Sequence, residues 1–226
     1  MPGYGCIMEE GAALPEFPAC HVTVDGNLSV DTTGRIIADN TGFRKNKNNE
    51  EKGLTGYLSH GGRTAAFGKT LKLHYQGYDS IFNPSLPGCT VPFTNGQDAG
   101  QTASVLDLAV TGTLTVNGSI TADATYSGAA THNRSAGPGG SIKVTAGALA
   151  GSGTISANGA RNAGSACGGG GRIAIRLTDK DATFDAFEGQ VVASGRYSTD
   201  GNPGGSGSAG TVYLQTAAEG EGRGTV

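Results

Sequence analysis

The sequence predicts an all-β fold in which short strands stack as the coils of a single-stranded, right-handed parallel β-helix. Between Ser141 and Gly159, the sequence SIKVTAGALAGSGTISANG alternates apolar and polar residues and turns at glycines, with no helical period. Such a short piece cannot bury its own apolar face. The chain repeats the piece at intervals of about 35 residues, which is typical of stacked repeats. The right-handed sense follows from the general rule for parallel crossovers.

Five segments carry this alternation, so we expect about five coils. The clearest internal match is GSITADA at 118–124 with GTISANG at 153–159. β-branched residues with glycine corners indicate stacked strands rather than stacked helices. The segments are Val22–Ala38, Val105–Ala122, Ser141–Gly159, Arg172–Gly195 and an incomplete Thr211–Val226.

Apolar residues at alternate positions of these segments should point inward and stack as ladders between coils. The expected inward residues are Leu106, Leu108, Leu114, Val116, Ile120, Ile142, Val144, Leu149, Ile155, Ile173, Ile175 and Val191. An end coil exposes unpaired strand edges. We therefore expect the C-terminal coil to stack on another coil, either of a longer parent chain or of a neighbouring molecule.

The repeats divide the chain into an N-terminal cap or extension over residues 1–21 and one β-helix domain over 22–226. Glycine-rich loops separate the repeats at Thr125–Gly140, Ala160–Gly171 and Arg196–Gly210, and should gather on one side. The chain ends at GEGRGTV, where we expect a new strand to start, which indicates truncation within the repeats. The N-terminal MPGYGCIMEEGAALPEF lacks the basic and apolar regions of a signal peptide. We expect a domain cut from a longer secreted protein, with a cytoplasmic protein as the alternative.

A much longer insertion spans about 40–104. It opens with the charge-mixed run FRKNKNNEEKG and continues with aromatic and proline residues between Tyr57 and Gly88. Those residues are too apolar for a flexible linker, so we expect them to pack on the flank of the coils as an ordered lid. A loop of this length is usually functional or has structure of its own.

Composition excludes several classes of partner. The formal net charge is −3, which indicates no steering toward nucleic acid. No run of about 18 apolar residues is present, so we expect no membrane insertion. No cofactor is predicted: GSGSAG at 205–210 matches G-x-G-x-x-G, but a strand rather than a helix follows it.

The succession LSHGG, LTVNGSITA, GPGGSIKVTAGALAGSGTISANG, CGGGGRIAI and GSAGTVYL resembles the glycine-rich parallel β-helix repeats of large secreted or surface-attached bacterial proteins. The resemblance covers most of Val22–Leu214. That family has no established catalytic residues. The resemblance therefore implies architecture and an extracellular or cell-surface location, and it implies no active site.

Candidate catalytic residues are few. Acidic residues on the expected strands (Asp25, Asp31, Asp107 and Asp123) do not recur at one register, so no acidic cleft is predicted. The best acid–base candidates are His60 and Asp79 of the insertion, with Arg63 nearby. The alternative for His60 is a structural bond to a loop carbonyl. His21 and His132 should simply be exposed.

Three aspartates and four cysteines are candidates for a metal site and for disulfides. Asp179, Asp181 and Asp185 in LTDKDATFD could hold a single cation, or they could form a solvated turn. Cys6, Cys20, Cys89 and Cys167 show no C-x-x-C spacing. Two disulfides, Cys6–Cys20 in the cap and Cys89–Cys167 between loops, suit an oxidising compartment. Four thiols are the alternative.

The sequence therefore predicts a non-enzymatic extracellular module, a stalk or adhesin segment of a bacterial surface protein, whose loops meet a glycan or protein surface. One alternative is a carbohydrate-active enzyme of the polysaccharide lyase or glycosidase type, working beside the insertion. Another is a subunit that self-associates end to end into a filament. A group of carboxylates, His and Arg within reach of one another on one open face would favour the enzyme.

Overall fold

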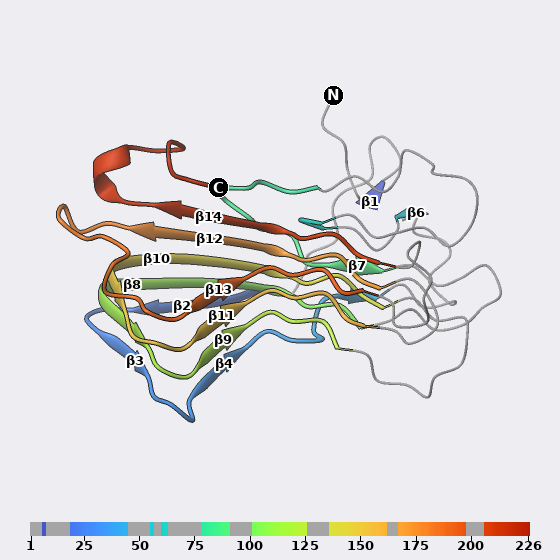
Figure 1. Cartoon of the computed structure of the whole chain (residues 1–226), viewed down its shortest axis with the longest axis horizontal. Coiled ribbons are helices and arrows are strands. Elements are labelled where there is room, and N and C mark those ends of the chain that lie inside the picture. Colours follow the sequence, from blue (N-terminus) through green and yellow to red (C-terminus); the bar gives the residue numbers. More distant parts are fainter. Residues whose placement is uncertain are drawn as a thin grey trace.

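The computed structural model describes residues 19–44, 60–62, 78–90, 101–125, 136–161, 167–197 and 206–226, together with the backbone of 6–7 and 55–56. These residues form an almost purely β structure (Figure 1). Within the described ranges, the single helix is the three-residue 3-10 helix η4 (Ala217–Glu219), and no helix has the length and apolar character needed to cross a membrane.

The larger of the two main sheets has six strands. Its order is β14-β12-β10-β8-β2, with β3 also paired to β8, and all of these pairs are parallel (Figure 1). We call it the large sheet. Its strands are β2 (Ala19–Val24), β3 (Leu28–Val30), β8 (Val105–Val116), β10 (Ser141–Ala150), β12 (Arg172–Leu177) and β14 (Thr211–Gln215).

The second main sheet, called the small sheet, has four parallel strands in the order β13-β11-β9-β4. Its strands are β4 (Arg35–Ile37), β9 (Ser119–Thr121), β11 (Thr154–Ser156) and β13 (Gln190–Val192). The chain alternates between the two sheets, because each large-sheet strand from β8 to β12 is followed by a small-sheet strand. The predicted all-β architecture of stacked parallel strands is confirmed at this level.

Two further sheets in the described part of the chain consist of two short strands each. β1 (Cys6–Ile7) pairs antiparallel with β6 (Thr55–Gly56), and β5 (Phe43–Arg44) pairs parallel with β7 (Cys89–Thr90).

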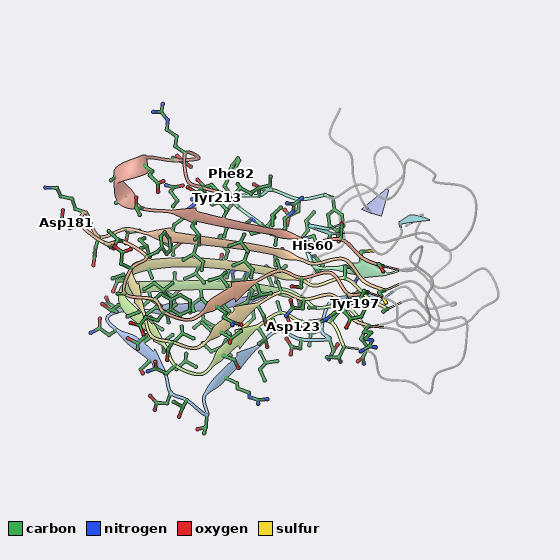
Figure 2. The ribbon with its side chains drawn as sticks, in the orientation of Figure 1. His60, Phe82, Asp123, Asp181, Tyr197 and Tyr213 are labelled. Atoms are coloured by element: carbon green, nitrogen blue, oxygen red, sulfur yellow. The ribbon has the colours of Figure 1, made fainter. Side chains whose placement is uncertain are left out.

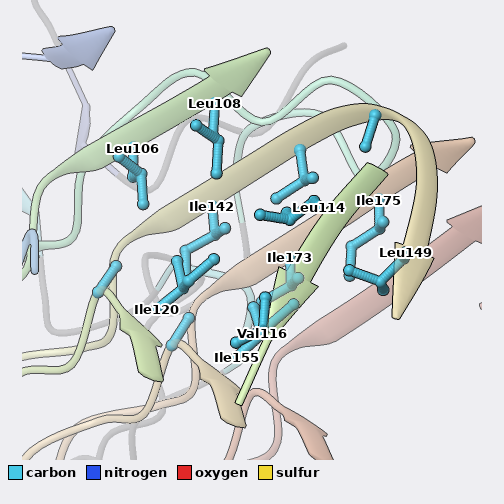
Figure 3. Packing of buried hydrophobic residues seen from close by; sticks show 14 of the residues in the cluster. Leu106, Leu108, Leu114, Val116, Ile120, Ile142, Leu149, Ile155, Ile173 and Ile175 are labelled. Carbon is cyan, nitrogen blue, oxygen red and sulfur yellow. The ribbon is translucent and has the colours of Figure 1, made fainter. Parts of the chain in front are cut away.

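The register of the strands explains the core. In the large sheet, Leu106 pairs with Ile142 and Ile142 with Ile173, so that equivalent apolar residues stack between the sheets (Figure 3). Ile120 and Ile155 stack in the same way in the small sheet. Burying an aliphatic side chain of this size contributes about 1.5–3 kcal/mol. The predicted inward residues are confirmed: all are at most 1% exposed except Val191, which is partly buried against the core.

Glycine-rich segments directly before β10 and β12 lie inside the molecule. Residues 136–140 and 167–171 are buried. A Cβ atom added at Gly140 would lie 2.0 Å from the Ser104 carbonyl oxygen, and one at Gly171 would lie 2.0 Å from that of Gly140. Only glycine allows backbones to approach this closely. These glycines are therefore packing residues where backbone lies on backbone.

Hydrogen bonds between the sheets close each repeat. The Gly140 N–H donates to the Ala122 carbonyl (3.0 Å), and the Gly171 N–H donates to the Ala157 carbonyl (2.8 Å). In each bond, the donor comes directly before a large-sheet strand (β10 or β12), and the acceptor comes directly after a small-sheet strand (β9 or β11). The gathering of the glycine-rich loops on one side stays a prediction.

The last residues fold back on β14. The Leu214 N–H donates to the Thr225 carbonyl (2.9 Å), and the Thr225 N–H donates to the Leu214 carbonyl (2.8 Å), in an antiparallel bridge. The chain therefore provides a partner for β14 itself at this point. Stacking of the C-terminal end on another coil stays a prediction.

Candidate functional site

Residues 78–88 of the long insertion, which we call the strap, lie on the outer face of the large sheet. Tyr78, Pro84 and Pro87 are buried. The Arg176 guanidinium on β12 donates from Nη2 to the Phe82 carbonyl (2.8 Å), and the Phe82 ring packs against Tyr213 of β14 at 6.2 Å between centroids (Figure 2). In this described part, the insertion packs on the large sheet.

The strap brings together the two described catalytic candidates. His60 Nε2 lies 3.5 Å from Asp79 Oδ2, and both atoms lie 3.3 Å from Oγ of Ser141 at the start of β10. His60 Nδ1 lies 2.9 Å from the Gly139 carbonyl oxygen. The side chains of His60 and Asp79 are 0% and 4% exposed. We call His60, Asp79, Ser141 and Arg172 the buried polar cluster. The third candidate, Arg63, lies outside the described residues.

Asp79 organises the strap through its carboxylate. Oδ1 accepts the Ser80 N–H at 2.8 Å, and Oδ2 accepts the N–H groups of Ser85 and Leu86 at 2.9 Å. The backbone of Asp79 has φ 74°, a left-handed conformation that non-glycine residues seldom adopt. Burial favours the neutral acid, but the hydrogen bond and charge of His60 and the backbone N–H groups outweigh it, so the pKa of Asp79 lies below its ordinary value.

Arg172, the first residue of β12, is a cation that interacts with this carboxylate. Its Nε donates to the Tyr78 carbonyl (2.7 Å), and its Nη1 donates to the Thr211 hydroxyl (2.9 Å). Burial lowers the pKa of Arg172, and the negative charge of Asp79 opposes that shift. The guanidinium therefore ties the strap to two neighbouring strands.

Sequence reasoning missed Ser141 and Arg172. The two residues occupy the same register position, since Ser141 pairs directly with Arg172. Each follows two buried glycines, in the sequences GGS and GGR. A polar residue at an outward position directly after a glycine pair is the signal that could have marked them.

The geometry does not suit nucleophilic catalysis. In a Ser-His-Asp relay, the carboxylate and the hydroxyl occupy opposite nitrogens of the imidazole ring. Here Asp79 and Ser141 both lie at Nε2, while a backbone carbonyl occupies Nδ1. The cluster is also sealed from solvent. These contacts match the structural alternative for His60, in which the ring binds a loop carbonyl.

The candidate cation residues lie at the turn after β12. Asp179, Asp181 and Asp185 are exposed, and the labelled Asp181 extends away from the sheets (Figure 2). In the part of the chain that the structure describes, no three His, Cys, Asp or Glu side chains are grouped to hold a metal ion. The structure therefore favours the solvated turn.

The remaining predicted residues are distributed over the molecule. Cys20 is exposed, Cys89 and Cys167 are buried, and all three are thiols in the structure. Cys89 lies in β7, and Cys167 opens the glycine segment before β12. The Cys6–Cys20 and Cys89–Cys167 bridges stay predictions for an oxidising compartment. The Cys6 side chain and His132 lie outside the described residues. His21 is exposed on β2, as predicted.

A second polar ladder follows the small sheet. Asp39 Oδ1 accepts the Asp123 N–H (2.7 Å), Asp123 Oδ1 accepts the Asn158 N–H (2.6 Å), and Asn158 Oδ1 accepts the Ser194 N–H (2.9 Å). Acidic residues thus recur at one register, contrary to the prediction, because Asp39 and Asp123 stack. Burial, with the Asp123 charge adding to it, raises the pKa of Asp39.

The ladder has a sequence signal that was overlooked. In each repeat, an alanine comes directly after the small-sheet strand and the ladder residue follows that alanine. The pairs are AD, AD, AN and AS at 38–39, 122–123, 157–158 and 193–194. Its side-chain oxygens are used by backbone N–H groups of the next repeat. The ladder therefore has a structural role.

No protein-family model matches this chain, and neither the curated proteins nor the solved structures give a match. The likeness to glycine-rich β-helix repeats therefore remains an expectation from the sequence.

Proposed function

We propose that this chain is a rigid, non-enzymatic module of a secreted or surface-attached bacterial protein. In this proposal, the large and small sheets are two walls of one right-handed parallel β-helix of about five coils. The module acts outside the cell as a stalk or adhesin segment, and the loops at the closing edge of the coils meet a glycan or protein surface.

Three features support the architectural part of the proposal. Strands alternate between two parallel sheets. Equivalent aliphatic residues stack from one repeat to the next. Hydrogen bonds such as Gly171 to Ala157 close the repeats between the sheets. Because backbone groups pair with the repeats above and below, cleavage by a protease would require several repeats to open together. Stiffness and protease resistance are what a stalk needs.

The burial of the His60–Asp79 pair is the observation that supports a non-enzymatic function. An acid–base enzyme must place a proton donor or acceptor within hydrogen-bond reach of its substrate. His60 and Asp79 are instead closed off by the strap and bonded to Gly139, Ser85 and Leu86. A polysaccharide lying on the outside of the coils would not touch either group. Binding without cleavage is the activity that this arrangement favours.

The test is a comparison of binding with cleavage on the same polysaccharides. The intact chain is applied to an array of bacterial and host glycans, and soluble samples of the same glycans are assayed for new reducing ends and unsaturated sugars. We expect selective binding that heat-denatured chain lacks, with no new chain ends. Cleavage that Asp79→Asn abolishes would replace the proposal with a carbohydrate-active enzyme. Binding to no glycan or protein surface, with particles that grow with concentration in light scattering, would replace it with a filament subunit.

A further inference from the structure

In the described part of the chain, the ring nitrogens of His60 face three oxygens: the Gly139 carbonyl, the Asp79 carboxylate and the Ser141 hydroxyl. Nδ1 lies 2.9 Å from the Gly139 carbonyl oxygen, which cannot donate. Nδ1 must therefore carry a proton. Nε2 lies 3.3 Å from Ser141 Oγ and 3.5 Å from Asp79 Oδ2. Whether Nε2 also carries a proton depends on where the hydroxyl and carboxyl protons of these two neighbours lie.

The hydroxyl proton of Ser141 is already used. Oγ lies 2.7 Å from the Leu86 carbonyl oxygen, which is its shortest contact and can only accept. Asp79 Oδ2 accepts two backbone N–H groups, from Ser85 and Leu86, so it is occupied as a carboxylate oxygen. Neither neighbour therefore has a proton to give to Nε2. In a neutral ring, Nε2 would carry a lone pair. That lone pair would face the oxygen lone pairs of Ser141 and Asp79 in a buried site, and this arrangement is repulsive.

We infer that His60 is a buried imidazolium and that its charge pair with Asp79 is a latch that holds the strap on the large sheet. With a proton on each ring nitrogen, the ring donates to Gly139 on one side and to Asp79 and Ser141 on the other. Among the described residues, the charged and titratable groups around the pair are the Arg172 guanidinium and the Tyr78 phenol, whose ring lies 4.8 Å from that of His60.

The latch gives the strap a defined sensitivity to pH. Removal of the proton from Nε2 takes away the donor that joins His60 to Asp79, while the Arg172 contact with the Tyr78 carbonyl remains. The strap should therefore loosen as pH rises. Loosening would uncover outward residues of β10, β12 and β14, among them Ser141 and Tyr213.

The protonation state can be measured directly in the intact chain. In a ¹⁵N-labelled sample at neutral pH, both ring nitrogens of His60 should show chemical shifts of protonated nitrogen and couplings to their own hydrogens. The Asp79→Asn variant should lose this pattern at Nε2. A wild-type spectrum with one nitrogen in the unprotonated range would overturn the inference, whatever the variant does.

Hydrogen exchange tests the latch. Protection factors of the Ser80, Ser85 and Leu86 amides should fall roughly a hundredfold in His60→Gln, because breaking a buried charge pair leaves one charge uncompensated. His21→Gln on the same sheet face is the matched control and should leave these amides unchanged. In the wild-type chain, protection of the same amides relative to the core amides of β10 should fall as pH rises. An unchanged ratio across pH, or full protection in His60→Gln, would refute the latch.

Discussion

The outer face of the large sheet carries two His–Asp pairs in opposite surroundings. His60 and Asp79 lie under the strap, 0% and 4% exposed. His21 of β2 lies 3.4 Å from Asp107 of β8, and these side chains are 68% and 23% exposed. Lys143 of β10 adds a cation, with its Nζ 2.7 Å from Asp107 Oδ2. The same two residue types thus form a sealed cluster in one region and a solvated ion pair in the other.

The difference lies in what surrounds each carboxylate. Asp79 accepts three backbone N–H groups within the strap and sits in a left-handed conformation. Asp107 is partly exposed and contacts the side chains of His21 and Lys143. Buried charges depend on complete hydrogen bonding, whereas exposed pairs contribute little. The comparison shows that a His–Asp pair in this chain organises structure only where the insertion covers it.

The largest expected effect comes from breaking the covered pair. Asp79→Ala removes the acceptor of the strap amides and leaves His60 and Arg172 without their anion. We expect a loss of about 3–5 kcal/mol in the free energy of unfolding. Asp107→Ala is the matched control and should cost less than about 1 kcal/mol. Urea denaturation of both variants measures the difference, and equal losses would contradict the comparison.

A smaller loss in the free energy of unfolding should follow from a substitution at Gly61, which changes the packing next to His60 and leaves the charged groups in place. A Cβ atom on Gly61 would lie 2.0 Å from the Gly171 carbonyl oxygen. We therefore expect Gly61→Ala to cost roughly 1–3 kcal/mol, as overpacking does. At Gly34, the nearest atoms would lie 3.1 Å away, so Gly34→Ala should cost less. Thermal unfolding checks the order, and a larger loss at Gly34 would show that close approach does not govern these glycines.

Acid should remove the contribution of the covered pair. The pKa of Asp79 is lower in the folded protein than in the unfolded chain. Its stabilisation is therefore fully present above the unfolded pKa of about 3.9 and is lost as pH falls through the folded pKa. The gap in unfolding free energy between wild type and Asp79→Asn should narrow as the solution is acidified. Urea midpoints from pH 6 downward measure this gap, which would stay constant if Asp79 contributed no charge.

The smallest effect should come from the solvated pair. Lys143→Met removes the 2.7 Å contact with Asp107, and we expect a change within about 1 kcal/mol that shrinks further in high salt. Denaturation at low and high ionic strength measures it. A loss as large as that of Asp79→Ala would mean that exposure does not separate the two regions.

Much of the fold follows from local pattern. Alternation in segments such as Ile142–Val144 determines which side chains point inward, because successive strand residues face opposite sides. Recurrence of the pattern along the chain indicates stacked parallel strands, and the described core agrees at Leu106, Ile120 and Ile173. The Asp39–Asp123 ladder could have been found in the same way, since its alanine–Asx pairs repeat at one offset.

The buried polar cluster could not be predicted in full. His60 and Asp79 were candidates, but 79 residues separate His60 from the Gly139 carbonyl that it binds, and Arg172 is still further along the chain. The packing role of Gly171 was also hidden, since a glycine in an exposed loop has the same sequence signature.

The sequence by itself determined the strand alternation, the repeat and the inward aliphatic ladders, because these depend on residues one or two positions apart and on a repeated offset. Only the tertiary structure decided that the strap covers one part of the large sheet and leaves His21 and Asp107 in water. It also decided that His60, Asp79 and Ser141 meet in a sealed site. The physical reason is that burial and hydrogen-bond partners of a polar side chain depend on segments far away in the chain.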